Sequence, residues 1–367
     1  MHWIDSAIII LFLAAMAGYG IWQSRFNKSS EDYFLGGRNL PWVAAMFSIV
    51  ATETSVLTFI SVPGLAYRQD WFFLQLALGY ILGRILVSIF LLPAYFKTGI
   101  TSIYEVLGNR FGIGIQKTAS GVFLITRVLA DGIRFLAVAV IVQIITGWSL
   151  VGAVMLIGVV TLIYTILGGI RTVVWVDSFQ FILYLAGGLL TIGFIISKLD
   201  VPFVSVIGQL ATEGKFQLVH WGWDLFRQPY VFISAVIGGM LLSFASHGVD
   251  YMMVQRVLGT KDLTSARKAM VGSGLFVFLQ FAIFLFAGSL IYYYLSGVEF
   301  AKDREFPTFI STYLPVGLKG LLLAGVLSSA MSTLSSSINS LASSTIMDWF
   351  KKNQSIKLSR YASLFWA

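Results

Sequence analysis

The chain of 367 residues is 57% hydrophobic and only 11% charged, with a formal net charge of +8 and no cysteine. A soluble domain carries about 25% charged residues, so this composition excludes that class and indicates an integral membrane protein. The basic residues lie in short segments between apolar stretches rather than on one patch, which argues against nucleic acid binding. The lack of cysteine excludes disulfides, thiolate catalysis and cysteine metal sites.

Nine apolar stretches are long enough to cross a bilayer as helices, which takes about 20 residues each. The first has neither a basic segment before it nor a small-residue cleavage site after it, so we interpret it as a span rather than a signal peptide. A tenth stretch begins at Tyr361, close to where the sequence stops, so we expect a truncated chain. The nine predicted spans are residues 3–22, 41–65, 71–96, 118–146, 149–168, 172–197, 229–248, 270–296 and 319–347.

The loops between these spans differ in positive charge. If the loop after the first span is cytoplasmic, fifteen of the 25 Lys and Arg residues, Arg256 among them, lie inside and seven lie outside. Cytoplasmic loops carry the excess of Lys and Arg, so we predict a multi-pass protein of the plasma membrane with its N-terminus outside. Three arginines, Arg84, Arg127 and Arg134, lie within spans.

Two spans are interrupted by polar or helix-breaking residues. The second contains ATETS at residues 51–55 and then Pro63-Gly64, and the seventh contains Gly238-Gly239 followed by SFASHG. Each could be a simple kink, since membrane helices tolerate Gly and Pro. The two interruptions are, however, five spans apart, which suggests two copies of one repeat. Because five is an odd number of membrane crossings, the second copy must be inverted relative to the first. Inverted-repeat transporters have such broken helices near the bilayer midplane, where the unwound backbone binds ions and substrate.

The stretch Leu321–Trp349 is long enough to span a bilayer, yet twelve residues between Ser328 and Thr345 are Ser, Thr or Asn. Many of these polar residues follow one another at intervals of three or four residues, and this spacing places their hydroxyls on one helix face. One interpretation is close packing of small residues against other helices. The other is an oxygen-lined site for a small hard cation. The residues of this face are Ser329, Ser332, Thr333, Ser336, Ser340 and Ser343.

Ionisable residues inside spans indicate functional sites, because each costs about 2.5–3.5 kcal/mol to insert unless it is paired or hydrated. Asp177 is the only charged residue between Thr172 and Ser197. It is either a carboxylate at the end of a helix, offset by Arg171, or a ligand for the cation held by the serines.

Other charges lie in the second, third and fourth spans. Asp131 and Arg134 are three residues apart and can pair on one helix face, while Arg127 can share that carboxylate or face an acidic substrate. Glu53 lies in the interrupted centre of its span, where it can bind a substrate or answer one of the arginines. Arg84 has no obvious partner, so we predict a packing or interface role for it.

Taken together, these features resemble the sodium:solute symporter family, which includes carriers of sugars, proline, sialic acid and monocarboxylates. The resemblance covers essentially the whole chain and rests on five motifs in order. They are DYFLGGR (Asp32–Arg38), ATETSVLTFISVPG in the second span, GGIRTVVWVD (Gly168–Asp177), DYMMVQRVLGTKDLTSARK (Asp250–Lys268) and MSTLSSSINSLASSTIMD (Met331–Asp348).

The resemblance implies an all-α, multi-span transporter domain with leucine-transporter-like inverted repeats. Residues 1–40 would form one extra N-terminal helix with its loop, residues 41–198 the first repeat, and residues 229–367 an incomplete second repeat. It also implies a first sodium site made by the carbonyls of Ala51, Thr54 and Ser329 and the hydroxyls of Ser332 and Thr333. A second site, which only some members have, matches Asp177, Ser335 and Ser336 here.

For the solute, we predict contacts from the breaks, the fourth span and aromatic residues. The chain departs from the usual residues of the family at two positions: Glu53 stands where neutral residues are common, and Tyr251 replaces a frequent glutamine. The solute therefore stays open among sugar, amino acid and carboxylate. The predicted contacts are Glu53, Ser246, His247, Tyr251, Arg127 and Arg134.

We therefore predict a secondary active transporter that uses sodium as coupling ion, needs no cofactor, and moves a small polar solute across the bilayer. The alternatives are proton coupling through Asp177 or Glu53, and a sodium-binding channel or sensor. A membrane enzyme using His247 with Asp250 is disfavoured, because the sequence has three histidines and no second catalytic cluster.

Overall fold

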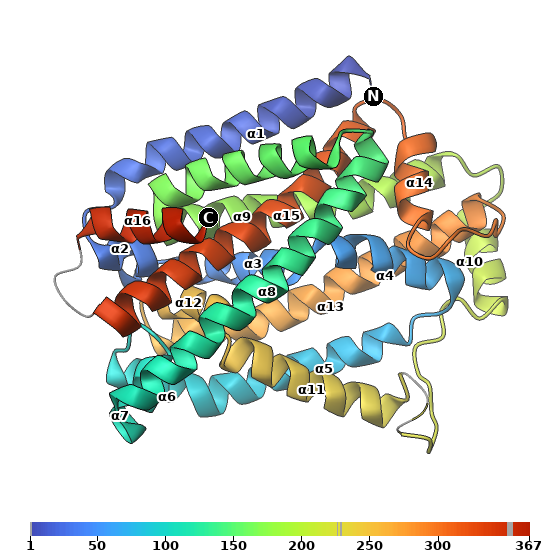
Figure 1. Ribbon diagram of the computed structural model, residues 1–367. Helices are drawn as coiled ribbons and strands as arrows, with labels where there is room; N and C mark the ends of the chain where they lie inside the picture. The colour runs from blue at the N-terminus through green and yellow to red at the C-terminus, as the bar shows by residue number, and fades with distance from the viewer. Residues whose placement is uncertain (1, 226, 228–229, 351–354) are drawn as a thin grey trace.

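The computed structural model describes residues 2–225, 227, 230–350 and 355–367, and its regular structure in those residues is helical apart from one isolated bridge between Leu40 and Thr260 (Figure 1). Short 3₁₀ turns (Ser24–Phe26, Gly36–Arg38) and π-helical turns (Val87–Leu91, Thr345–Phe350) join some of the helices. The helices are α1 (Trp3–Gln23), α2 (Ser30–Leu35), α3 (Trp42–Glu53), α4 (Val56–Arg68), α5 (Phe73–Leu86), α6 (Leu92–Thr98), α7 (Tyr104–Phe111), α8 (Ile113–Thr146), α9 (Leu150–Ser197), α10 (Phe203–Thr212), α11 (Phe232–Gly248), α12 (Tyr251–Leu258), α13 (Leu263–Tyr294), α14 (Glu305–Thr312), α15 (Leu318–Ser344) and α16 (Ile356–Trp366).

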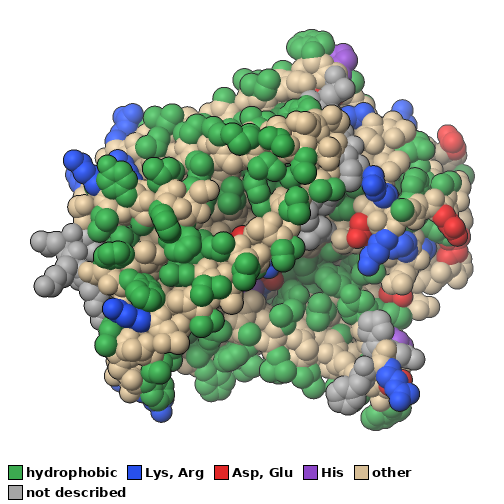
Figure 2. Space-filling view, in the orientation of Figure 1, with side chains coloured by type: hydrophobic (Ala, Val, Ile, Leu, Met, Phe, Trp, Pro, Cys, Tyr) green, Lys and Arg blue, Asp and Glu red, His purple; other side chains and the backbone are tan. Residues whose placement is uncertain are grey.

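The long helices form a bundle with short helices at both ends. In Figure 1, α2, α6, α7 and α12 lie toward one end, while α10 and α14 lie at the other, where the chain also begins. On the face shown in Figure 2, hydrophobic side chains cover the middle of the bundle. Lys and Arg side chains appear at both ends of the bundle, and acidic side chains gather at the α10–α14 end. An apolar belt between two polar ends is the surface that a lipid bilayer requires.

Five helices or continuous helical segments among the described residues are long and apolar enough to span a membrane, and two bent helix pairs raise this number to seven. One of the five, α9, has 48 residues but is interrupted at Gly169, whose φ of 63° and ψ of −166° are not helical. The predicted spans 149–168 and 172–197 therefore meet at this residue. A Cβ at Gly169 would lie 2.7 Å from the Tyr33 carbonyl oxygen, so only glycine fits here.

The second predicted span is broken where its sequence suggested. Helix α3 ends at Glu53, α4 begins at Val56, and the two are bent by 66°. The Ser55 side chain begins α4 by accepting a hydrogen bond from the Thr58 amide at 3.3 Å. Pro63 lies inside α4 without ending it.

In the seventh predicted span, the break lies at the end of SFASHG and not at Gly238-Gly239. Helix α11 runs straight through Gly238-Gly239 and ends at Gly248, and α12 follows at 64°. The glycine serves packing instead: a Cβ on Gly239 would collide with the Leu76 carbonyl of α5, and one on Gly79 with the Val236 carbonyl of α11. Small residues let membrane helices approach closely, so α5 and α11 lie side by side.

The helices pack in two groups that meet along a seam. Helices α3, α4 and α5 pack with α11 and α13, whereas α15 packs with α1, α8 and α9. Helix α3 also contacts α9 and α15, and these contacts form the seam. The predicted start of the seventh span at 229 lies outside the described residues, and the predicted orientation and repeat boundaries stay predictions.

The two neighbouring glycines of α11 allow a matched test. We expect Gly239→Ala to destabilise the protein by about 1–3 kcal/mol, because its methyl group must displace the α5 backbone. We expect Gly238→Ala, whose Cβ meets nothing within 4 Å, to change stability by less than about 1 kcal/mol. Thermal unfolding of the two purified variants in detergent measures the difference, and equal melting temperatures would contradict the packing described here.

Candidate ion and solute site

The break between α3 and α4 faces the hydroxyl-rich helix α15. The Thr54 amide donates to the Val50 carbonyl at 3.0 Å, and Thr54 itself is extended, with φ of −79° and ψ of 100°. A helix end leaves its last carbonyls without helical partners. One of the free carbonyls, that of Thr54, accepts a hydrogen bond from the Ser329 hydroxyl at 2.6 Å.

A cavity of about 10 Å³, room for one water-sized particle, lies at this contact. Of the five residues predicted for the first sodium site, the structure brings Ala51, Thr54, Ser329 and Ser332 together on its wall. The fifth, Thr333, donates to the Ser329 carbonyl at 3.3 Å and lines a neighbouring cavity of about 20 Å³. Hydroxyl and carbonyl oxygens from α3, the break and α15 thus converge around Ser329.

Gln180 lines the same small cavity and was not singled out from the sequence. Its side chain is 2% exposed, and neither amide atom has a hydrogen-bond partner among the described residues. Burying an amide without partners is costly. Its spacing of three residues from Asp177 was the available signal, because it places both side chains on one face of α9.

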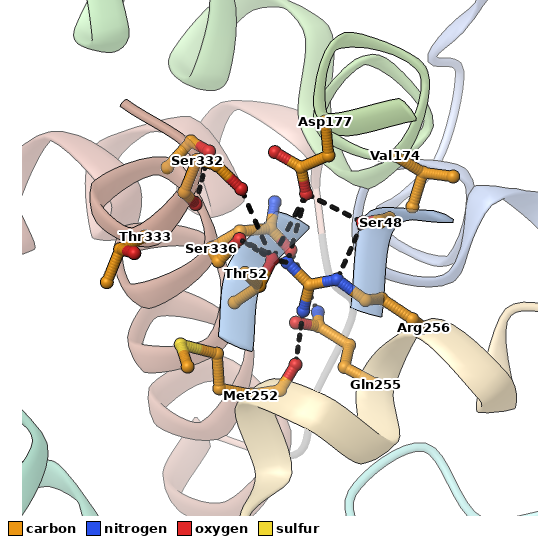
Figure 3. Close-up of polar contacts among 12 residues, drawn as sticks. Ser48, Thr52, Val174, Asp177, Met252, Gln255, Arg256, Ser332, Thr333 and Ser336 are labelled. Carbon is orange, nitrogen blue, oxygen red and sulfur yellow. Dashed lines mark hydrogen bonds and ion pairs between the residues drawn. The ribbon is translucent and has the colours of Figure 1, made fainter. Parts of the chain in front are cut away.

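The predicted second site lies deeper in the seam and is shown in Figure 3. The Ser48 hydroxyl donates to Asp177 Oδ2 at 2.6 Å, and the Thr52 hydroxyl donates to the same oxygen at 3.3 Å. Ser336 lies 3.1 Å from Thr52, oxygen to oxygen. The Ser335 hydroxyl donates instead to the Ser332 carbonyl at 3.0 Å. Ser336 is therefore linked to Asp177 through the Thr52 hydroxyl, whereas Ser335 bonds to Ser332 within α15.

Arg256 enters this site, which corrects its assignment to a cytoplasmic loop. Helix α12 is bent by 64° from α11 and is buried over all its residues, which carries the guanidinium into the seam. Its Nη2 lies 3.3 Å from Asp177 Oδ2, and both side chains have zero exposure. The sequence assignment failed because nothing in the local pattern showed that the seventh span continues beyond its break.

A second buried ion pair lies at the end of α3, next to the α3–α4 break. The predicted packing role of Arg84 is incomplete, because its guanidinium pairs with Glu53 and also donates to Ser273 of α13 at 2.7 Å. His247 Nε2 lies 3.6 Å from the same Glu53 oxygen, and the His247 Nδ1 to Ser246 Oγ distance is 2.9 Å. The structure thus brings three of the predicted solute contacts together at one place.

The remaining predicted solute contacts lie elsewhere. Arg127 binds Asp250 at 2.6 Å and approaches Asp131 at 3.6 Å, while the predicted pair of Asp131 with Arg134 has its closest atoms 4.0 Å apart. The Arg134 side chain stays 45% exposed and lines the cavity beside Thr333.

Tyr251 is separate from the others. It is fully buried, and its hydroxyl donates to the Thr101 carbonyl at 2.8 Å and lies 2.7 Å from the Ser343 hydroxyl. These contacts hold the start of α12 against α15.

A model of the sodium:solute symporter family matches residues 33–362. The chain belongs to this family. Its relatives are sodium-coupled carriers and not enzymes, with sodium as the coupling ion. A solved Na⁺-coupled sialic acid symporter, in a substrate-bound outward-open state with a novel Na⁺ site, has a TM-score of 0.90 at 28% identity over 99% of this chain and 78% of that chain. The predicted leucine-transporter-like fold of this symporter-family chain is thereby confirmed.

Among curated relatives, the sodium/sialic acid symporter SiaT of Proteus mirabilis is 31% identical over 93% of this chain and 70% of its own length. The sodium/sialic acid symporter NanT of Aliivibrio fischeri is 29% identical over 94% of this chain and 69% of its own length. The human sodium/iodide cotransporter is 29% identical over 95% of this chain and 56% of its own length. The chain therefore spans between about half and about two thirds of the length of these carriers.

The Glu53–Arg84 pair provides a test of the buried charges. We expect Glu53→Gln to destabilise the protein by about 3–5 kcal/mol, because the fully buried Arg84 loses its counter-charge. The double variant Glu53→Gln with Arg84→Gln should regain part of that loss, since no unpaired charge remains. Thermal unfolding in detergent measures both.

The matched control is Glu31→Gln, which removes an exposed carboxylate from the surface pair with Arg38. Exposed pairs contribute little, so this variant should melt close to the wild type. If Glu53→Gln melts as high as Glu31→Gln, the Glu53–Arg84 pair does not stabilise the core.

Proposed function

We propose that this chain is a sodium-coupled symporter that moves a small polar solute across the plasma membrane by alternating access, with its N-terminus outside. The observation that carries the proposal is the convergence of backbone carbonyls at the α3–α4 break with the Ser329 and Ser332 region of α15. Membership of the family supports sodium as the coupling ion.

In the proposed cycle, sodium binds among Ala51, Thr54, Ser329, Ser332 and Thr333. The ion then links the group of helices around the break to the group around α15, which the Ser329–Thr54 hydrogen bond already joins. Binding therefore stabilises the conformation in which these oxygens converge. Coupling to the solute equals the difference in sodium affinity between the two access states.

We place the solute next to the ion, between the break and α8. Ser55 at the start of α4 and Arg134 of α8 line one cavity, and Glu53, held by Arg84, keeps 17% of its side chain exposed. Arg127 is engaged by two carboxylates, so Arg134 is the arginine we propose for an acidic group of the solute. Relatives named for sialic acid, iodide and monocarboxylate transport all carry anions, which favours an anionic solute here.

Sodium is preferred to a proton as the coupling ion. Both carboxylates predicted as proton acceptors, Asp177 and Glu53, contact buried arginines. In this conformation, protonation of either would leave a buried guanidinium without a counter-charge, which is costly.

Uptake into proteoliposomes tests the proposal. Solutes are first screened by thermal shift with and without sodium, because a substrate should stabilise most when both are present. The binder is then supplied outside vesicles that hold an inward sodium gradient. We expect accumulation above the outside concentration, which collapses when the gradient is dissipated. Uptake that only equilibrates would indicate a channel, and uptake driven by a proton gradient without sodium would indicate proton coupling.

Two serines of α15 provide a matched test of the ion site. Ser332→Ala removes a proposed sodium ligand, so we expect the sodium concentration for half-maximal uptake to rise by about tenfold, the equivalent of about 1.4 kcal/mol. Ser340 is equally buried, but its hydroxyl donates to the Ser337 carbonyl within the helix at 3.0 Å. Ser340→Ala should keep the wild-type sodium dependence. Equal sodium dependence of the two variants would rule out Ser332 as a ligand.

A further inference from the structure

Arg256 bridges both groups of helices through one buried guanidinium (Figure 3). From α12, it donates to the hydroxyls of Ser48 and Thr52 on α3, each at 2.7 Å, and to the carbonyl of Met252 in its own helix. It also contacts Ser336 on α15 and Asp177 on α9. The guanidinium therefore fills the space between the Asp177 carboxylate and the hydroxyl face of α15.

These contacts take up oxygens that a cation beside Asp177 would need. Asp177 Oδ2, the Ser336 hydroxyl and the Thr52 hydroxyl all lie within hydrogen-bond distance of Arg256. Arg256 already supplies the positive partner of this carboxylate, and a second cation among the same oxygens would be repelled by the first. A sodium ion that used these same oxygens would compete with Arg256 for them.

The contact between Arg256 and Asp177 is nevertheless incomplete. Strong arginine–carboxylate pairs are bidentate, with N–O distances of about 2.7–2.9 Å. Here a single nitrogen lies 3.3 Å from Oδ2, and Oδ1 has no hydrogen-bond partner among the described residues. The carboxylate is fully buried and yet only partly satisfied, which leaves it able to accept a different cation.

We propose that Arg256 is a tethered cation that competes with sodium for Asp177. Sodium enters the second site only when the guanidinium withdraws, and the guanidinium returns when sodium leaves. Because Arg256 belongs to the second half of a broken span, ion occupancy at Asp177 is linked to the position of α12. This inference rests on the proposed sodium coupling and specifies a residue that sets the affinity of its second ion.

Sodium titration of the purified full chain in lipid nanodiscs tests the competition. Melting temperature is followed while sodium chloride replaces potassium chloride at constant ionic strength. We expect Arg256→Gln to melt below the wild type without sodium, because Asp177 loses its positive partner. We also expect it to bind sodium at least about tenfold more tightly and to regain stability as sodium is added.

The double variant Asp177→Asn with Arg256→Gln is the matched control. It lacks both the carboxylate and the competing cation, so it should lose the tightened sodium response of Arg256→Gln while keeping the response of the first site. If Arg256→Gln does not fold, Arg256→Lys replaces it. Lysine keeps the positive charge but lacks the planar fork of five N–H donors with which Arg256 holds its neighbours, so we expect sodium affinity to rise by about threefold.

The outcomes separate this inference from the proposed function. A wild-type protein that responds to sodium, together with arginine variants that bind it no more tightly, would show that Arg256 only positions its neighbours and would overturn the competition. No sodium response in the wild type or in any variant would overturn the proposed sodium coupling itself.

Discussion

The interior of this protein depends on three ion pairs that each match a carboxylate inside the bundle with a positive charge. Asp177 contacts Arg256, Glu53 contacts Arg84, and Asp250 contacts Arg127. In each pair the two charges come from different segments of the chain, so the pairs, together with the hydrogen bonds between helices, fix which helices lie together. Unpaired, each carboxylate or guanidinium would cost several kcal/mol in this environment.

The pairs differ in what they join. Glu53 and Arg84, with Ser273 and Ser243, tie the end of α3 to α5, α13 and α11, which all belong to one group of helices. Asp177 and Arg256 cross the seam between the groups. A carrier that changes access must keep contacts within each moving unit and exchange those between units. The Glu53–Arg84 pair suits a contact kept within one moving unit. The incomplete Asp177–Arg256 pair suits a contact that is exchanged between units.

The break in the second span gives the same seam its backbone oxygens. An intact helix bonds its carbonyls internally, whereas the end of α3 leaves several free at the depth where α15 presents hydroxyls. The direct Ser329–Thr54 hydrogen bond shows that the two surfaces already fit. An ion and a guanidinium could then act at neighbouring points of one seam, one at the break and one at Asp177.

The membrane class, most of the spans, an interruption within residues 51–55 and the hydroxyl face of α15 could be predicted from the sequence, because hydrophobic length and helical periodicity are local properties. Four of the five residues predicted for the first ion site line one cavity. Only the tertiary structure decided which charges pair, that Gly239 serves packing, that Gln180 lines the ion cavity and that Arg256 reaches Asp177. Partners that lie 31 and 79 residues apart, such as Glu53 with Arg84 and Asp177 with Arg256, meet through helix packing, which no local pattern encodes.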